Sequence, residues 1–429
     1  MTRTEEAPVD RKPTMAVPFF RPSITEAEIE QVAECLRSGW LTTGPRVRAF
    51  EQRFAEFVGA KNAIAVTSCT AALHLAVEAL NLHAGQGVLV PTLTFAATAE
   101  VVRYQGAVPI LVDCDPASLN MDLADAERKL QAVCSGDIFQ GLDPHTVGMI
   151  PVHVGGLMMD LGRIDAFARR HGLWVVEDAA HAVPAAYRAG PAHHWRRCGG
   201  NTAAVSCFSF YSNKPMTTGE GGMATTDHDE LAQRIRRMSL HGLSHDAWDR
   251  YSGNGSWDYR IVAPGFKYNL TDIAASLGLN QLERAEAMRR DRQTLAENYL
   301  RDLASVDEIE LPPRVPDRVH AWHLFPIRLR LNRLAVDRDA FLELLRRRGV
   351  ACSVHWRPLH LHPYYQEAFG WKEQDFPVAT AEWQRLISLP LFPGMREEEQ
   401  AYVVLVLRDL CRRYGVQKIV TTGRPTQPR

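Results

Sequence analysis

One lysine of this chain stands in an unusual setting. An apolar run over residues 203–210 predicts a strand, and a short polar stretch with Lys214 follows it, before a glycine-rich turn over residues 217–222. An amine held at the end of a strand is partly removed from water, which lowers its pKa. Such an amine forms a Schiff base with an aldehyde. Taken alone, a lysine beside glycines is also typical of a purely structural role.

A phosphate could be bound near the same lysine. Ser209, five residues before Lys214, offers a hydroxyl, and the glycines at 219, 221 and 222 let the backbone pass close to a ligand. A second phosphate site is indicated at Thr70, where a strand and a short loop lead into a helix whose first N–H groups attract anions. Thr70 could equally be a simple helix N-cap. Pyridoxal phosphate (PLP) carries both an aldehyde and a phosphate.

Two further strand ends carry residues that suit this cofactor. The apolar run Leu173–Val176 meets its first acidic residues at its carboxyl end, Glu177 and Asp178. A carboxylate there could bond the protonated pyridine nitrogen, and we choose Asp178 because Glu177 points to the opposite face by strand alternation. An ordinary acidic strand end is the alternative. Phe95, just beyond another strand, could stack on the pyridine ring, although core packing is the common use of a phenylalanine.

Length and composition place the chain among ordinary globular enzymes. It has 429 residues, 46% hydrophobic and 23% charged, which is enough for two domains with a large core. A formal net charge of −1 gives no electrostatic reason to expect nucleic acid or an anionic membrane as partner. The eight cysteines form no CxxC pair, so we expect reduced thiols and no metal site. We see no signal peptide or membrane span and expect a cytoplasmic location.

Apolar strands and helical patterns alternate through the first two thirds of the chain. Seven strands are predicted, at residues 63–67, 87–91, 108–113, 147–152, 173–177, 203–210 and 223–226. Helical patterns separate most of them, at residues 70–80, 95–104, 122–131 and 163–171. Continuous apolar strands joined by helices indicate a mainly parallel sheet covered on both faces. The ligand of such a sheet lies at the carboxyl ends of its strands.

A large domain over residues 16–290 and a smaller C-terminal α/β domain over residues 291–418 are therefore expected. A helix beginning in a capping box at Ser23 and Glu26 precedes the sheet, and a long helix over residues 272–302 follows it. In the smaller domain, strands are predicted at residues 323–331 and 351–355, and helices at residues 338–348 and 397–414. Residues 1–15 and 419–429 read as disordered tails.

Taken together, these motifs resemble the DegT/DnrJ/EryC1/StrS family of nucleotide-sugar aminotransferases, which are PLP enzymes of fold type I. The runs that carry the resemblance span residues of about 16 to 415 and are 38–45, 70–74, 177–181, 209–210 with Lys214, 218–222, 265–272 and 388–394. The resemblance implies a fold-type I large domain with a mainly parallel seven-stranded sheet and a smaller C-terminal α/β domain.

The resemblance also implies roles for individual residues. Lys214 becomes the lysine that binds the cofactor aldehyde and carries the proton, and Asp178 pairs with the pyridine nitrogen. His181 is expected near the 3-hydroxyl of the ring. The phosphate would be held by Ser209, Thr70 and the backbone at Cys69, a position where the family often has glycine. Asn269 would reach the phosphate of a neighbouring subunit, which implies a homodimer, unless it is the N-cap of the long helix, a place that Thr271 could also fill.

The implied activity is transfer of an amino group, in this family usually from L-glutamate, to a keto group of a nucleotide-linked sugar. The runs 241–244, 265–271 and 320–323 are most similar to members that aminate C4. Cyclitol or 3-keto-sugar aminotransferases, and a PLP-binding regulator without turnover, are alternatives. A sugar 3-dehydratase is disfavoured, because that branch carries histidine where this chain has Lys214.

Two segments invite other interpretations. His355, His360 and His362 could suggest a metal, but they match a family loop, so we expect none. The segment 187–200 is longer and more basic than the resemblance leads us to expect, and it could alter the mouth of the substrate site. The loops around residues 187–200, 241–260 and 355–365 are expected to select the nucleotide and the sugar.

Overall fold

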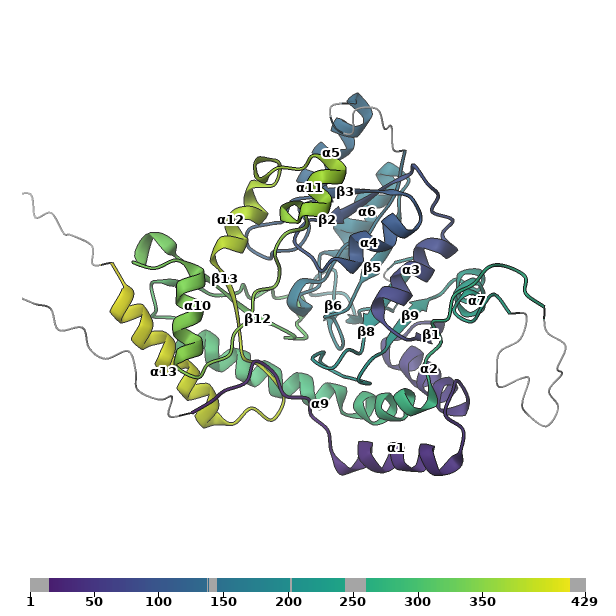
Figure 1. Cartoon of the computed structure of the whole chain (residues 1–429), viewed down its shortest axis with the longest axis horizontal. Coiled ribbons are helices and arrows are strands. Elements are labelled where there is room, and N and C mark those ends of the chain that lie inside the picture. The colour runs from purple at the N-terminus through teal and green to yellow at the C-terminus, as the bar shows by residue number, and fades with distance from the viewer. Residues whose placement is uncertain (1–14, 137, 139–144, 201–202, 244–259, 417–429) are drawn as a thin grey trace, which may run out of the picture.

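A seven-stranded sheet forms the centre of the protein in the computed structural model, which describes residues 15–136, 138, 145–200, 203–243 and 260–416 (Figure 1). Its strands are β1 Asn62–Val66, β2 Gly87–Pro91, β3 Val108–Val112, β4 Thr146–Met149, β5 Trp174–Asp178, β8 Val205–Ser209 and β9 Gly222–Thr226. They lie in the order β1-β9-β8-β5-β4-β2-β3. The prediction of seven strands in one sheet is confirmed.

One strand of the sheet runs against the others. The pairs β2·β3, β2·β4, β4·β5 and β5·β8 are parallel, whereas β9 is antiparallel to both β8 and β1. Strand β9 follows β8 after residues 210–221, which contain no helix in the structure, and parallel neighbours need a longer crossover. The fold is therefore α/β with a mainly parallel sheet, and the lysine-bearing loop turns the chain back on itself.

Helices cover both faces of the sheet, as its apolar strands predict. Ala63 and Ala65 of β1 belong to one core, while Ile64 and Val66 face another. The first core packs against α2, α5, α6 and α9, and the second against α3, α4 and α7. The bounds of these helices are α2 Pro45–Val58, α3 Cys69–Ala79, α4 Ala97–Tyr104, α5 Leu123–Ser135, α6 Leu161–His171, α7 Asp229–Met238 and α9 Asp272–Asp302.

A second, smaller sheet lies toward the C-terminus in the order β10-β12-β13. Its strands are β10 Ile309–Glu310, β12 Phe325–Leu329 and β13 Leu386–Leu389, and the helices of this part are α10 Arg338–Arg347, α11 Pro363–Phe369, α12 Pro377–Arg385 and α13 Glu397–Tyr414. Figure 1 shows the 31-residue helix α9 running along one side of the molecule, from the region of β1 to that of α13.

The division of the chain at residues 290 and 291 stays a prediction, and it falls inside α9. The tails predicted at residues 1–15 and 419–429 lie outside the described residues, apart from Met15. Within the described residues, no helix has the length and apolar character that a membrane span requires. All eight cysteines are free thiols.

Two local predictions were wrong. Helix α1 (Glu26–Ser38) is capped by Thr25 and Glu28, not by Ser23 and Glu26. The reason is tertiary, because Glu28 is fully buried and also accepts hydrogen bonds from Gln281 (2.9 Å) and Arg284 (2.5 Å) of α9.

The strand predicted at residues 351–355 is the second error. Only a single bridge forms there, between Ser353 and Ser388. The residues that follow turn toward a cavity instead of continuing a sheet, and His355 and Trp356 line it.

Candidate active site

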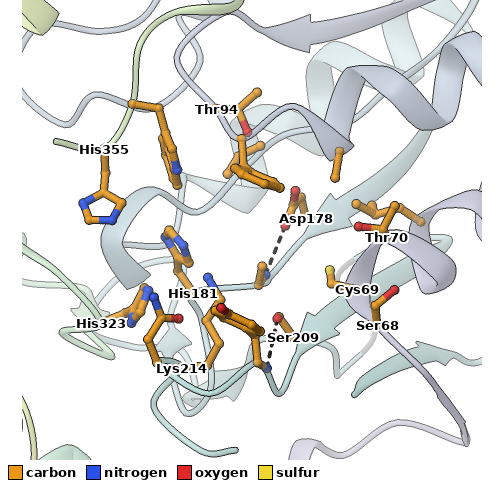
Figure 2. A pocket seen from close by; sticks show the side chains of 18 of the residues that line it. Ser68, Cys69, Thr70, Thr94, Asp178, His181, Ser209, Lys214, His323 and His355 are labelled. Carbon is orange, nitrogen blue, oxygen red and sulfur yellow. Dashed lines mark hydrogen bonds between the residues drawn. The ribbon is translucent and has the colours of Figure 1, made fainter. Parts of the chain in front are cut away.

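A cavity of about 570 Å³ opens at the carboxyl ends of the parallel strands (Figure 2). Seven of the eight residues predicted from the sequence to bind a cofactor line it: Cys69, Thr70, Phe95, Asp178, His181, Ser209 and Lys214. These residues follow or end strands β1, β2, β5 and β8, whose carboxyl ends meet at one edge of the sheet. The sheet therefore brings together residues that lie up to 145 positions apart in the sequence.

Lys214 is held in the loop that joins β8 to β9. Its backbone N–H donates to the carbonyl of Tyr211 (2.9 Å), and Thr218 N–H donates to the carbonyl of Phe210 (2.9 Å), so the loop folds tightly around the lysine. Burial lowers the pKa of Lys214 to about 8, and the nearby carboxylate of Asp178 opposes that shift. A substantial fraction of the amine is then unprotonated near neutral pH, as a nucleophile and proton carrier needs to be.

Asp178 lies across the cavity from the lysine. Its Oδ2 accepts a hydrogen bond from Thr98 Oγ1 (2.8 Å) and its Oδ1 accepts one from the N–H of Ala180 (3.1 Å). Burial raises the pKa of Asp178, whereas these two hydrogen bonds and Lys214 favour the ionised form. A buried carboxylate held on both oxygens is suited to pair with a cation inside the cavity, such as a protonated pyridine nitrogen.

The start of helix α3 forms the other end of the cavity. Ser68 is the N-cap, and its Oγ accepts from the N–H of Ala71 (3.0 Å), so the alternative that Thr70 is the cap was wrong. Cys69 and Thr70 occupy the first turn, where backbone N–H groups lack partners within the helix and favour an anion. Ser209 lines the same end of the cavity (Figure 2). Burial raises the pKa of the Cys69 thiol, so it stays neutral beside an anion.

Gly222 allows the backbone of β9 to pass directly beneath this helix start. A Cβ at Gly222 would lie 2.5 Å from the Ser68 carbonyl oxygen and 2.6 Å from the Cys69 nitrogen. Such distances are too short for any side chain, and the atoms in the way belong to backbone. The glycine therefore leaves the N–H groups at the start of α3 free to bind a phosphate. These N–H groups, Lys214 and Asp178 together fit PLP.

Replacing Gly222 by alanine is expected to weaken cofactor binding by about 5- to 150-fold, because overpacking of this kind typically costs about 1–3 kcal/mol. The measurement is PLP titration of the apoenzyme, followed by absorbance. Gly162→Ala is the matched control, since the nearest atom to its added Cβ is 3.4 Å away. Unchanged PLP affinity in Gly222→Ala would contradict the assignment of the phosphate end.

The exposed face of the cavity carries Phe95. Its side chain is 62% exposed and lines the cavity, so the alternative that it packs in the core was wrong. A ring exposed to this degree at a cavity can receive a ligand ring, so the predicted stacking role stays a prediction.

His181 faces Lys214 from an aromatic wall. Its Nδ1 accepts from the N–H of Gly155 (3.2 Å), which assigns the ring proton to Nε2. The ring stacks on Trp356 at 5.1 Å, and the His323 ring lies 4.2 Å away. Burial, followed by Lys214 and His355, lowers the pKa of His181 well below its usual value, so it is neutral. It can therefore donate one hydrogen bond into the cavity.

Several residues of this site were missed by the sequence reasoning. Thr98 orients Asp178, while His323, Trp356 and Tyr211 line the cavity. Two of them, His323 and Trp356, come from the part of the chain beyond α9 and pack against residues more than 140 positions earlier. The run 320–323 was singled out only for its similarity to members that aminate C4, and the sequence does not say which strand end His323 or Trp356 meets.

Asn269 does not line the cavity of its own chain. Its Nδ2 donates to Thr43 Oγ1 (2.7 Å), and its Oδ1 accepts from the Lys267 amine. The alternative that Asn269 caps α9 was wrong, because Thr271 is the N-cap and accepts from the N–H of Ala274 (3.3 Å). A role toward the cofactor of a neighbouring subunit stays a prediction.

The three histidines that could suggest a metal have separate hydrogen-bond partners. His355 Nδ1 bonds Ser388 Oγ (2.9 Å), His360 bonds Thr92 Oγ1 (2.7 Å) and Thr380 Oγ1 (2.9 Å), and His362 bonds the carbonyl of Arg357 (3.3 Å). In the described part of the chain, these histidines belong to no group of three metal-ligating side chains with converging atoms.

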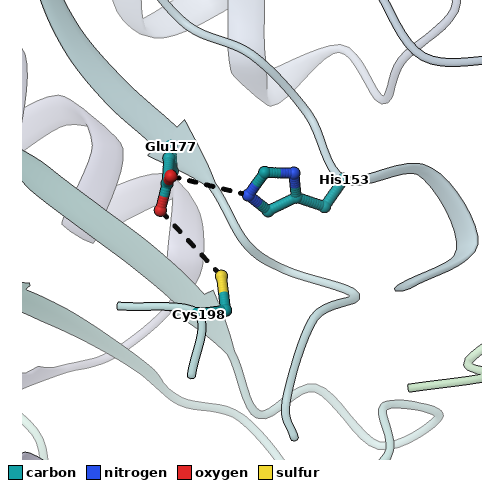
Figure 3. Close-up of side chains that lie close together, drawn as sticks. All are labelled: His153, Glu177 and Cys198. Atoms are coloured by element: carbon teal, nitrogen blue, oxygen red, sulfur yellow. Dashed lines mark hydrogen bonds and ion pairs between the residues drawn. The ribbon is translucent and has the colours of Figure 1, made fainter. Parts of the chain in front are cut away.

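One group of three side chains that could bind a metal does come together in the described residues, on the side of β5 opposite to Asp178. It consists of His153, Glu177 and Cys198 (Figure 3). His153 Nδ1 accepts from the N–H of Met159 (3.3 Å), which assigns the ring proton to Nε2, 3.8 Å from Glu177 Oε1. A metal-bound histidine needs the opposite tautomer, with its second nitrogen donating to an acceptor. Glu177 also accepts from Ser206 Oγ (2.8 Å). The tautomer favours a buried hydrogen-bond network over a metal site.

The basic segment 187–200 forms a small sheet of its own. Strands β6 (Ala186–Tyr187) and β7 (Arg196–Arg197) pair with each other, and β6 also pairs with β11 (Arg318–Val319). Within the described residues, none of this segment lines the cavity. The effect of this segment on the substrate mouth stays a prediction. The second loop predicted to select substrate, residues 241–260, lies largely outside the described residues.

Comparisons with known proteins identify the same fold and chemistry. The DegT/DnrJ/EryC1/StrS aminotransferase family matches residues 22–408. The spore coat polysaccharide biosynthesis protein SpsC of Bacillus subtilis is 42% identical over 397 residues, which cover 92% of this chain and 97% of SpsC.

Solved structures agree with the sequence relatives. The PLP form of Spr1654, a putative sugar aminotransferase from Streptococcus pneumoniae, superposes with a TM-score of 0.82 at 29% identity, covering 93% of this chain and 99% of its own. A PMP form of Spr1654 matches equally well. S. venezuelae DesV, in complex with a ketimine intermediate, matches with a TM-score of 0.81 at 29% identity, covering 93% of this chain and all of its own. The chain therefore belongs to the DegT/DnrJ/EryC1/StrS aminotransferase family and is a PLP-dependent sugar aminotransferase of fold type I.

Proposed function

We propose that this enzyme transfers an amino group from L-glutamate to the C4 keto group of a nucleotide-linked sugar, with Lys214 and Asp178 as catalytic residues. The observation that carries the proposal is the shared cavity, in which the Lys214 amine, with a pKa of about 8, and the buried carboxylate of Asp178 lie beside the helix start of α3.

Each residue has a distinct task in this proposal. PLP supplies an electron sink at the carbon that bears the amino group. Lys214 moves the proton on and off the reacting carbons as general base and acid. Asp178 holds a proton at the pyridine nitrogen, and Thr98 and the N–H of Ala180 fix the direction of its carboxylate. Cys69, Thr70 and Ser209 bind the phosphate, His181 donates from Nε2 toward the 3-hydroxyl, and Phe95 stacks on the ring.

The substrate class follows from the relatives. SpsC is named as a spore coat polysaccharide biosynthesis protein, and Spr1654 is described as a putative sugar aminotransferase. From these relatives we carry over a sugar substrate. Its activation by a nucleotide, and a product that enters a polysaccharide or a glycosylated metabolite, rest on the resemblance of the sequence motifs. The preference for C4 rests on the sequence runs around residues 241–244, 265–271 and 320–323. A keto-inositol or a 3-keto sugar is the alternative acceptor.

A second subunit completes the proposed unit. Asn269 lies outside the cavity of its own chain and is assigned to the phosphate of a neighbouring subunit's cofactor in a homodimer. The cytoplasmic location likewise stays a prediction. A regulator that binds PLP without turnover is disfavoured, since binding alone does not require an amine with a lowered pKa.

The test is the absorbance spectrum of the purified enzyme before and after L-glutamate. We expect a PLP band that converts to the pyridoxamine phosphate form, and we expect 4-keto nucleotide sugars to restore it. The panel should include 3-keto nucleotide sugars and keto-inositols. A band that ignores L-glutamate would exclude that donor, and restoration by keto-inositol alone would replace the proposed acceptor.

A pH prediction follows from the lowered pKa of Lys214. The amine reacts with the cofactor aldehyde only when it is unprotonated, so the rate of PLP uptake by the apoenzyme should rise about tenfold per pH unit below pH 8 and level off above it. Stopped-flow absorbance measures this rate. Because Asp178 raises the pKa of the lysine, Asp178→Asn should move the midpoint to lower pH. A rate that still climbs steeply at pH 10 would contradict the lowered pKa.

A further inference from the structure

His323 is a buried polar residue to which the proposed mechanism gives no task. It is 5% exposed and lines the cavity, yet neither of its ring nitrogens has a hydrogen-bond partner among the described residues. Leaving both nitrogens of a buried imidazole without partners is costly. The side chain is therefore set up to meet a polar group of a ligand.

The backbone around His323 holds the ring in place. Its N–H donates to the carbonyl of Gly155 (3.0 Å), and the buried guanidinium of Arg292 donates to the carbonyl of Trp322 (3.2 Å) and, at 3.5 Å, to that of His323. A Cβ at Gly156 would lie 2.8 Å from Ala321 Cβ, so the segment also sits tightly against the loop after β4. The ring is positioned by backbone and not by a partner of its own.

The position of the ring limits which part of a ligand it can meet. Figure 2 shows His323 grouped with Lys214 and His181, on the side of the cavity away from Thr70 and Ser68. The phosphate end is thus remote, and a group near His323 is close to the carbon on which Lys214 acts. No hydrogen bond joins the His181 and His323 rings, which meet at 4.2 Å with a tilt of 56°.

The protonation state of His323 limits which polar group of a ligand its ring can bind. Burial, followed by His181, Lys214 and Arg292, lowers its pKa well below the usual value, so the ring is neutral and has one donor and one acceptor nitrogen. A carboxylate has no proton to give and is bound best by cations. A hydroxyl can both donate and accept, so it suits either nitrogen in either tautomer.

We propose that His323 is a specificity-determining residue, whose ring contacts the hydroxyl on the carbon next to the keto group of the acceptor sugar. The assignment rests on the proposed function, because it takes a keto sugar as the acceptor. The proposed contact forms only in the acceptor half reaction, because L-glutamate has no hydroxyl on the corresponding carbon. The donor half reaction should therefore be indifferent to the ring nitrogens of His323.

The experiment uses the holoenzyme as wild type and as His323→Phe, which keeps an aromatic ring beside His181 and removes both nitrogens. Single-turnover absorbance gives kcat/KM for the donor half reaction with L-glutamate. It also gives kcat/KM for the acceptor half reaction with a 4-keto nucleotide sugar and its 3-deoxy analogue. His323→Gln restores one donor and one acceptor on an amide. His320→Asn is the matched control, because His320 lies outside the cavity and Asn keeps an acceptor for the N–H of Trp322 (2.8 Å).

We expect wild type to prefer the hydroxylated sugar by about 10- to 100-fold, which is the effect of losing one buried hydrogen bond and leaving its partner unsatisfied. In His323→Phe, kcat/KM for the hydroxylated sugar should fall by the same factor, while kcat/KM for the 3-deoxy analogue should equal that of wild type. With L-glutamate, kcat/KM should stay within about twofold of wild type. His323→Gln should recover part of the preference, and His320→Asn should keep all of it.

Other outcomes overturn the assignment. A His323→Phe enzyme that still prefers the hydroxylated sugar removes His323 from that contact. Loss confined to the L-glutamate half reaction would mean that the ring serves the donor carboxylate, and equal losses in both halves would mean that it acts on the cofactor or the fold. A wild-type enzyme that accepts L-glutamate but no keto sugar overturns the proposed function itself, and the assignment with it.

Discussion

Lys214→Ala is expected to lower turnover by at least about 1,000-fold, because one residue acts as both the nucleophile and the proton carrier. No other amine lines the cavity within the described residues to take over the proton transfer. The cofactor should still bind through the phosphate end and Asp178, but without the absorbance band that depends on the lysine. Steady-state transamination and the absorbance spectrum are the two measurements.

Two further variants serve as controls for Lys214→Ala. Lys61→Ala removes an exposed lysine that pairs with Asp229 far from the cavity, and it should leave turnover unchanged. Lys214→Arg keeps a cation in the same place but offers no amine that deprotonates near pH 8, so it should be as inactive as Lys214→Ala. Turnover that persists in Lys214→Ala would mean that another residue is the proton carrier.

Asp178→Asn is expected to lower kcat by about 100-fold or more, because the charge that favours a protonated pyridine nitrogen disappears. Asparagine keeps the size of the side chain and an oxygen that can accept from Thr98, so the fold should persist. The PLP affinity should fall as well. The measurements are kcat for the full reaction, the PLP titration, and the thermal unfolding midpoint.

Glu177→Gln is the matched control for Asp178→Asn, since the two residues are neighbours on β5 and face opposite sides of the sheet. Glu177 is fully buried in the network with His153 and Ser206. Its replacement should cost stability, about 1–3 kcal/mol for a disturbed buried hydrogen bond, and leave kcat within about threefold. If Glu177→Gln lost kcat and Asp178→Asn did not, the assignment of the pyridine partner would have to be exchanged between them.

Local sequence was enough to predict most of the phosphate end of the cavity. The helix start after β1 was predicted, and so was its place in the cavity, because strand, loop and helix are encoded by neighbouring residues. The choice of Ser68 over Thr70 as N-cap was not predicted. Both are hydroxyl residues two positions apart, and only the structure shows that the N–H of Ala71 donates to Ser68 Oγ.

The start of helix α1 also depends on contacts that the local sequence does not reveal. Two overlapping capping boxes were available near its start, and the one at Thr25 and Glu28 forms because Arg284 and Gln281 of α9 meet Glu28. Those partners lie more than 250 positions away. The strand predicted at residues 351–355 failed for a similar reason, because that segment lines the cavity instead of extending the small sheet.

Short runs of residues were enough to predict the seven strands, most of the helices between them, and the strand ends that carry Thr70, Phe95, Asp178, Ser209 and Lys214. Periodicity and strand alternation are local properties, so neighbouring residues specify them. The folded chain alone shows that Thr98 orients Asp178, that Glu177 lies in a separate buried network, and that His323 and Trp356 complete the cavity. Those contacts join distant segments, and they depend on how whole helices and sheets pack, which no single run of residues encodes.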